Sequence, residues 1–130
     1  MNPDQDKALL RVDGLKTYFP VRGGVLLTAK AQCKAVDDIS LEIGAGETLG
    51  LVGESGCGKT SIAVCLLRLL PDNAQIKGGH IHFDGVDLVA LPEDQMRTYR
   101  WNRISMVFQA AMNALNPVYT VEDQILEAIP

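Results

Sequence analysis

The residues best suited to chemistry in this sequence form a glycine-rich stretch at positions 53–61. It reads Gly-Glu-Ser-Gly-Cys-Gly-Lys-Thr-Ser and contains the pattern G-x-x-x-x-G-K-[ST], with Gly53, Gly58, Lys59 and Thr60 at its fixed positions. The pattern is typical of loops that hold nucleotide phosphates between a strand and a helix. The sequence therefore predicts a phosphate-binding loop. A glycine-rich turn with a surface lysine is the plain structural alternative.

Each residue type in this loop has a physical role. The glycines at positions 53, 56 and 58 are expected to reach positive φ and to let successive backbone N–H groups approach phosphate oxygens. The following helix adds the partial positive charge of its N-terminus. Lys59 is expected to place its charge on the β- and γ-phosphates, and Thr60 to offer its hydroxyl to Mg²⁺.

The elements on either side must position this loop. Residues 47–52 predict a short apolar strand, and residues 61–70 predict a buried helix that stops at Pro71. Two further helices are predicted, one from Pro92 to about Arg103 and one that Thr120 caps. The other predicted strands are 8–19 with a bend at Gly14, 25–27, 39–43, 81–83 and 86–88 around an Asp84-Gly85 hairpin turn, and 104–108.

Composition limits the possible functions. A chain of 130 residues that is 47% apolar suits one domain or part of one. The net charge of −4 gives no basic field that would favour nucleic acid. No apolar run reaches the length of a membrane span, so we expect no direct membrane insertion. Cys33, Cys57 and Cys65 have no paired spacing, which suits a reducing cytosol. Of these, Cys57 at the helix start is expected to have a lowered thiol pKa.

Two other patterns have plain interpretations. His80 and His82 share one face of a strand and could bind a metal, but we expect no third ligand close to them and therefore a solvated strand face. Arg97, Arg100 and Arg103 recur at helical spacing beside acidic residues, and we expect them to form a solvated helix face that does not bind nucleic acid.

The motifs together resemble the ATPase subunits of ABC transporters. The loop has the family's G-x-S-G-C-G-K-T form, and residues 34–48 resemble the strand and turn that precede it. Residues 79–88 resemble the family's β-subdomain hairpin, and residues 105–109 resemble the strand that ends in its Q-loop glutamine. The run Ala114-Leu115-Asn116-Pro117 is similar to the oligopeptide, dipeptide and nickel import branch.

This resemblance implies an α/β fold: a P-loop NTPase core that is incomplete here, joined to an antiparallel β-subdomain from residues 8–43 and 79–90. It also implies that Phe19 stacks on adenine, with Tyr18 as the competing candidate, and that Gln109 reaches Mg²⁺ and the attacking water. Lys59 and Gln109 are then the candidate catalytic residues, and Thr60 and Gln109 the candidate Mg²⁺ ligands. The candidate nucleotide-binding residues are Phe19, Gly53, Glu54, Ser55, Gly56, Cys57, Gly58, Lys59, Thr60 and Ser61.

The resemblance further implies a function and partners. ATP binding and hydrolysis, with Mg²⁺, would drive import of peptides or a related small solute. The loop after Gln109 would contact membrane permease subunits, and a second ATPase subunit, identical or different, would complete the catalytic unit. Such a protein is expected to lie peripherally on the cytoplasmic face of the cell membrane.

Departures from the family pattern lead to one more expectation. The signature L-S-G-G-Q, the second acidic motif and the switch histidine do not occur in these 130 residues. We therefore expect the N-terminal part of one nucleotide-binding domain, lacking the strand between 47–52 and 104–108 and inactive in hydrolysis by itself. The alternatives are an ABC ATPase outside transport, a nucleotide-binding fragment without catalysis, and a P-loop kinase, which the glutamine context disfavours.

Overall fold

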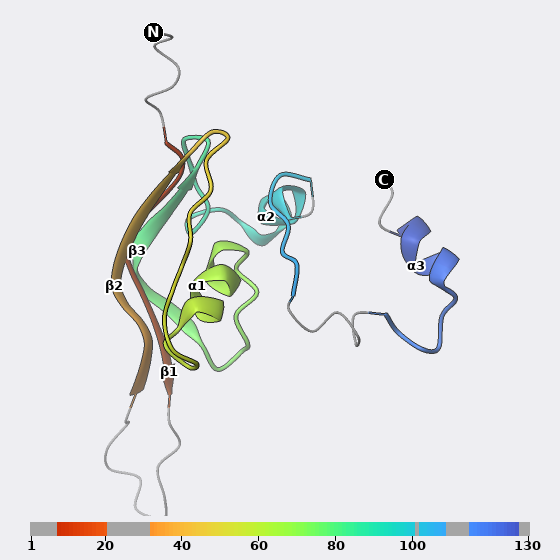
Figure 1. The fold of residues 1–130 in the computed structure, drawn as a ribbon, viewed down its shortest axis with the longest axis horizontal. Coiled ribbons are helices and arrows are strands. Elements are labelled where there is room, and N and C mark those ends of the chain that lie inside the picture. The colour runs from red at the N-terminus through yellow and green to blue at the C-terminus, as the bar shows by residue number, and fades with distance from the viewer. Residues whose placement is uncertain (1–7, 21–31, 101, 109–114, 128–130) are drawn as a thin grey trace, which may run out of the picture.

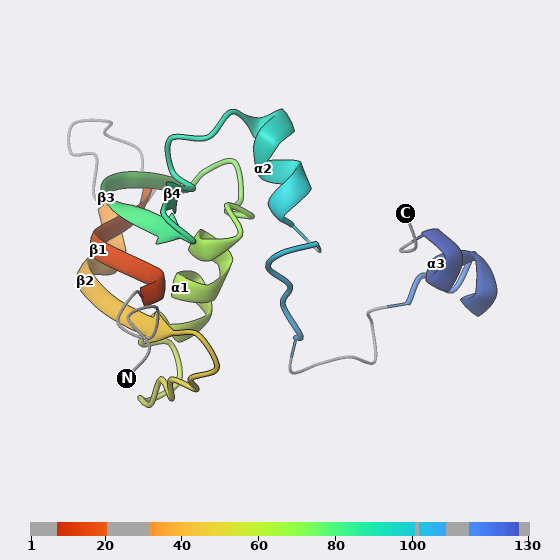
Figure 2. The same cartoon turned by 90° about the horizontal axis from the view of Figure 1, so that it is seen from above.

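A computed structural model describes residues 8–20, 32–100, 102–108 and 115–127 of the chain. Within them, a curved antiparallel sheet has a short helix against one face (Figures 1 and 2). The elements are β1 (Ala8–Pro20), β2 (Gln32–Gly44), α1 (Lys59–Leu66), β3 (Gln75–Phe83), β4 (Val86–Asp87), α2 (Glu93–Tyr99) and α3 (Val121–Glu127). The expected antiparallel β-subdomain is thus present.

The sheet has the strand order β2-β1-β3-β4, and β1 pairs antiparallel with both of its neighbours. The bend predicted at Gly14 is confirmed, because the register of β1 shifts between Val12 and Leu15 and Gly14 has φ 55°. The predicted hairpin turn is also confirmed, since Asp84 and Gly85 separate β3 from β4. Strand β3 begins earlier than predicted, at residue 75.

The core lies between the sheet and α1. The register shift at Gly14 puts Val12 on the same face of β1 as Leu15 and Thr17, and all three side chains are buried there. The one buried polar side chain among the described residues, Thr17, is satisfied because its Oγ1 lies 3.1 Å from Cys65 Sγ. Burial of each large apolar side chain contributes about 1.5–3 kcal/mol. The buried cluster consists of Val12, Leu15, Val36, Ile62, Cys65, Ile81, Leu88 and Met96.

Two predicted strands are absent. Within the described part of the chain, residues 47–52 and 104–108 join no sheet, and the one bridge there is a parallel bridge between Arg100 and Ile104. Val52 is 97% exposed and Val107 is 93% exposed. An apolar run forms a strand only where a neighbouring strand takes up its N–H and C=O groups, and no such neighbour lies beside either segment among the described residues. The expected parallel core is therefore not observed in this part of the chain.

The first two helices are shorter than predicted. Helix α1 ends at Leu66 instead of residue 70, because Arg68 has φ 51°, which an α-helix does not accommodate. As a result Leu69 is half-exposed instead of buried. Helix α2 starts directly after Pro92, as predicted, but ends at Tyr99, since the next residue is extended.

Helix α3 begins as predicted, with a side-chain cap. The N–H of Asp123 donates to Thr120 Oγ1 at 3.1 Å, which satisfies a free donor of the first turn. The helix buries no residue and stands apart from the sheet in both views (Figures 1 and 2). Across the described ranges, none of the helices has the length and apolar character that a membrane crossing requires. The predicted strand 25–27 lies outside the described residues.

Candidate nucleotide-binding site

The glycine-rich loop leads directly into α1, which begins at Lys59. Gly56 has φ 81° and Gly58, the residue before the helix, has φ 93°. The prediction of positive φ is therefore confirmed at these two positions. Residues other than glycine rarely adopt this left-handed conformation. The prediction is wrong at Gly53, where the need is for space instead: a Cβ there would lie 2.6 Å from Cys57 Sγ.

The loop is seated against strand β2. A Cβ built on Gly58 would meet the carbonyl oxygen of Ala35 at 2.4 Å, closer than any real contact of that kind. The first helical hydrogen bond starts at the same glycine, since the N–H of Ile62 donates to the Gly58 carbonyl at 3.0 Å. The sheet therefore fixes where the loop ends and the helix begins.

The Lys59 side chain folds back over the loop. Its Nζ donates to the carbonyl oxygens of Gly53 and Glu54, both at 2.7 Å, and to Cys57 Sγ at 3.2 Å. These three contacts hold the ammonium group against the loop backbone. A positive charge is thus positioned where the sequence pattern predicts an anion.

The loop and the first turn of α1 line a hollow of about 370 Å³ that is open to solvent. This volume is within the range of pockets that take small ligands. The lining residues include a lysine, residues that carry hydroxyl groups and glycines that leave the backbone uncovered, a set suited to an anion that carries a metal. The residues that line it are Ser55, Gly56, Gly58, Lys59, Thr60 and Ser61.

The two cysteines near α1 have opposite environments. The hydrogen bond from Lys59 lowers the pKa of the exposed Cys57 thiol, as predicted for the loop position. Burial raises the pKa of Cys65, against a smaller opposing effect of the hydrogen bond with Thr17. Cys57 is therefore the thiol with the greater thiolate character.

Comparison with known families decides the relationship. The family profile of the ABC transporter covers residues 36–128, which include the loop, α1 and the β3–β4 hairpin. The chain belongs to the ABC transporter family.

Several proteins that are similar to this chain are named as ATP-binding proteins of transporters. The chain is 44% identical, over 98% of its length, to the probable peptide ABC transporter ATP-binding protein y4tR of Sinorhizobium fredii, of which it covers 36%. It is 39% identical, over 98% of its length, to the oligopeptide transport ATP-binding protein OppD of Salmonella typhimurium, again covering 36%. It is 47% identical, over 99% of its length, to the peptidoglycan transport ATP-binding protein YejF of Agrobacterium fabrum, covering 22%. The ABC family chain thus spans about a third of the length of the first two relatives.

The two candidates for the adenine contact lie on opposite faces of the sheet. The Tyr18 hydroxyl donates to Asp37 Oδ1 at 2.7 Å, and Lys34 Nζ lies 5.4 Å from the centre of the Tyr18 ring. That hydrogen bond raises the pKa of Tyr18 and, together with the bond from Lys34, lowers the pKa of Asp37. Tyr18 is therefore already engaged in a polar cluster on the face away from α1.

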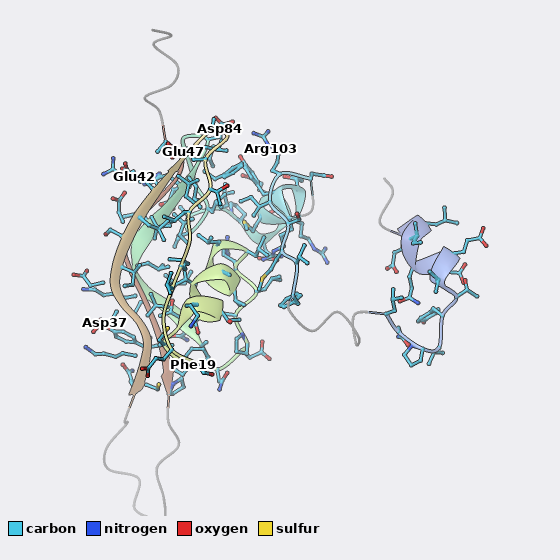
Figure 3. All side chains as sticks on the ribbon, viewed as in Figure 1. Phe19, Asp37, Glu42, Glu47, Asp84 and Arg103 are labelled. Atoms are coloured by element: carbon cyan, nitrogen blue, oxygen red, sulfur yellow. The ribbon has the colours of Figure 1, made fainter. Side chains whose placement is uncertain are left out.

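Phe19 follows the buried Thr17 by two residues and so points toward the α1 side of the sheet. Its partner on β2 is Cys33, close to Ala35, where the loop touches that strand. Figure 3 likewise places Phe19 and Asp37 on opposite sides of the sheet. Both residues lie at the same end of β1, but Phe19, and not Tyr18, is on the face that α1 covers.

Gln109, the remaining predicted site residue, lies outside the described residues. The segment before it is described up to Phe108, which is 57% exposed and joins no strand. The assignment of Gln109 to Mg²⁺ and water therefore stays a prediction that follows from the family pattern.

Two interpretations of polar residues need correction. Arg100 does not lie on a solvated face: it is half-buried, donates to the carbonyls of Leu67 and Arg68, and pairs with Glu93. The hydrogen bonds tie the end of α2 to the segment after α1, which helical spacing alone does not indicate.

His80 and His82 also differ from expectation. A third potential metal ligand, Asp87, lies close to both of them. Burial raises the pKa of that carboxyl, but hydrogen bonds from His80 and two backbone N–H groups outweigh the effect and lower it. The signal was available in the sequence: a two-residue turn at Asp84-Gly85 pairs residue 82 with residue 87.

Proposed function

We propose that this chain supplies the phosphate-loop part of an ATP-binding subunit in an ABC importer of peptides or a related small solute. The observation that carries the proposal is the hollow at the start of α1, which loop residues and Lys59, Thr60 and Ser61 line, with the Lys59 ammonium held against the loop backbone. The peptide and oligopeptide transport names of the y4tR and OppD relatives support the peptide branch.

The residues present fit a nucleoside triphosphate with its metal. Among the described residues, none that lines the hollow is acidic. The nearby Ala35 carbonyl leaves no room for a side chain at position 58, so we expect the loop N–H groups to stay accessible to phosphate oxygens. The loop amides and Lys59 would hold the phosphates, and the Thr60 hydroxyl would contact Mg²⁺. When bound, Mg²⁺ neutralises phosphate charge during transfer to water.

Lys59 has a specific part in this proposal. Its ammonium donates to two loop carbonyls in the structure, so the charge is close to the hollow before any phosphate arrives. Phosphate oxygens are stronger acceptors than neutral carbonyls because they are charged. Lys59 would therefore exchange its carbonyl partners for the phosphate, and its short movement would order the loop around the ligand.

The remaining roles are proposed on the family pattern. Phe19 would stack on adenine, and Gln109 would orient water beside Mg²⁺. The segment after Gln109 would contact permease subunits, and a second ATPase subunit would be needed for hydrolysis. A tagged chain should then retain the permease subunits of a peptide importer from solubilised membranes of its host, and their absence would argue for an ABC ATPase outside transport.

The direct test is calorimetric titration of the 130-residue chain with Mg·ATP. Lys59→Ala should weaken binding by roughly 2–4 kcal/mol, because a charge-assisted contact with the phosphates is lost. Lys77→Ala is the matched control: Lys77 is exposed on β3, outside the hollow, and its removal should leave the affinity unchanged. Equal affinity of Lys59→Ala and the parent chain would contradict the assignment.

A further inference from the structure

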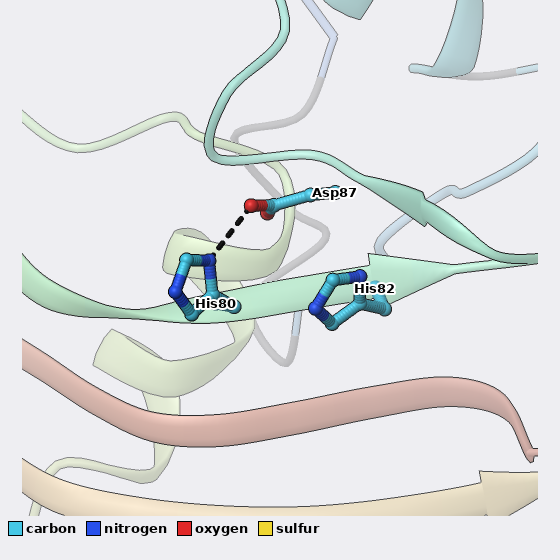
Figure 4. A group of neighbouring side chains, drawn as sticks. All are labelled: His80, His82 and Asp87. Atoms are coloured by element: carbon cyan, nitrogen blue, oxygen red, sulfur yellow. Dashed lines mark hydrogen bonds and ion pairs between the residues drawn. The ribbon is translucent and has the colours of Figure 1, made fainter.

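A second group of ligand side chains lies away from the nucleotide site, on the β3–β4 hairpin (Figure 4). His80 and His82 of β3 and Asp87 of β4 each offer one ligand atom, and these atoms all lie within 4.8 Å of one another. No residue of the phosphate loop or of α1 belongs to this group. The nucleotide-binding proposal therefore does not explain it.

The backbone, and not a chance choice of rotamers, brings the three residues together. His80 and His82 point to the same face of β3 because side chains alternate along a strand. Ile81 between them is fully buried, so the two imidazoles point away from the core. In the hairpin register His82 is paired directly with Asp87, which places the carboxylate on the same face.

The carboxylate is also held in place. Asp87 Oδ2 lies 2.8 Å from His80 Nδ1, and Asp87 Oδ1 accepts hydrogen bonds from the backbone N–H of Val89 at 3.0 Å and of Ile81 at 3.4 Å. Its side chain is only 21% exposed. Hydrogen bonds of this kind orient ligands in metal sites and limit the entropy lost when an ion binds.

We propose that His80, His82 and Asp87 form a binding site for one divalent transition-metal ion, of the class that includes Zn²⁺, Co²⁺ and Ni²⁺. Imidazole nitrogen with a carboxylate is the donor set these ions take, in contrast to the all-oxygen set of Mg²⁺. Ligand distances of about 2.1 Å place donor atoms roughly 3–4 Å apart, so small side-chain rotations close the site. Water would fill the remaining positions, because His80 is exposed.

The charges around the group favour a cation. On the neighbouring strand β1, Asp13 pairs with His80 and Arg11 with His82 in the sheet register. The positive charge of Arg11 is compensated, since its guanidinium lies 2.9 Å from Asp13 and 3.3 Å from Glu42. With Asp87 included, the charged side chains named here are three carboxylates and one guanidinium, so their balance is negative.

The experiment is a titration of the 130-residue chain with Ni²⁺ in the absence of nucleotide, followed by NMR and calorimetry. The chain has only 2 histidines, so each imidazole signal can be assigned from one variant. We expect both signals to broaden together at one equivalent of Ni²⁺. His82→Gln and Asp87→Asn should each weaken binding by about tenfold or more. Glu127→Gln, which removes an exposed carboxylate of α3, should change it by much less.

Two further measurements test whether a loss of binding arises from unfolding of the variant and whether the ion binds to a cysteine instead. His80→Gln removes an exposed ligand without touching the core, so lost binding in this variant cannot arise from unfolding. Co²⁺ reports its ligands in the absorption spectrum, and a sulfur-to-metal charge-transfer band would assign the ion to Cys33 or Cys57 instead. That band, or unchanged Ni²⁺ affinity in His80→Gln and His82→Gln, would overturn the proposal. So would imidazole signals that do not respond to the ion.

Discussion

The close approach of the loop to strand β2 gives a prediction whose size follows from the geometry. Gly56 and Gly58 both have left-handed φ, at 81° and 93°. They differ in their surroundings: a Cβ at position 56 meets nothing within 4 Å, whereas one at position 58 meets the Ala35 carbonyl oxygen at 2.4 Å. Alanine at position 56 therefore adds backbone strain alone, whereas alanine at position 58 adds the same strain and a collision between its Cβ and the Ala35 carbonyl oxygen.

Gly56→Ala should cost about 1–2 kcal/mol, the usual strain of a left-handed L-residue. Gly58→Ala carries the same strain and also forces the loop or β2 to move, which costs about 1–3 kcal/mol more by comparison with overpacked cores. Each change also stabilises the protein by about 0.4–1 kcal/mol through the unfolded chain. Because that term is common to both variants, the difference between them measures the collision alone.

The assay is urea unfolding of the parent chain and both variants, followed by circular dichroism, with limited proteolysis as an independent measure of opening. We expect Gly58→Ala to be the less stable variant by about 1–3 kcal/mol. Equal stability of the two variants would refute the reasoning, because it would mean that the Ala35 carbonyl does not contact the loop.

Three further predictions concern the nucleotide site. Phe19→Ala should weaken Mg·ATP binding by about 0.5–1.5 kcal/mol more than the loss of buried apolar area alone accounts for, because the stacking contact is lost as well. Tyr18→Ala should leave the affinity unchanged. The reverse result in calorimetry would show that the stacking residue is misassigned. Cys57, whose thiol pKa is lowered, should react with maleimide faster than Cys65 and remain reactive to lower pH, and ATP should protect it; peptide mapping that finds no protection would place Cys57 outside the phosphate site. The 130 residues alone should release no phosphate steadily, since no signature motif or catalytic acid occurs in them; steady release that Lys59→Ala abolishes would contradict this.

The sequence by itself determined the features that depend on local geometry. The spacing of Gly53, Gly58, Lys59 and Thr60 predicted the loop and the start of the helix, because the motif encodes a tight turn followed by free N–H groups. The Asp84-Gly85 hairpin and the Thr120 cap followed from equally local chemistry. The separation of Tyr18 from Phe19 also follows from the sequence, because adjacent side chains of a strand point to opposite faces.

Only the tertiary structure decided which segments find partners. Apolar runs at 47–52 and 104–108 have the pattern of strands, yet they remain unpaired among the described residues, because pairing depends on segments distant in sequence. The spacing of Arg100 predicts a solvated side chain, whereas folding brings it to carbonyl groups near the end of α1. The contact between Gly58 and Ala35 likewise joins positions that only folding brings together. Local spacing encodes turns and caps, whereas pairing and burial arise from the whole chain.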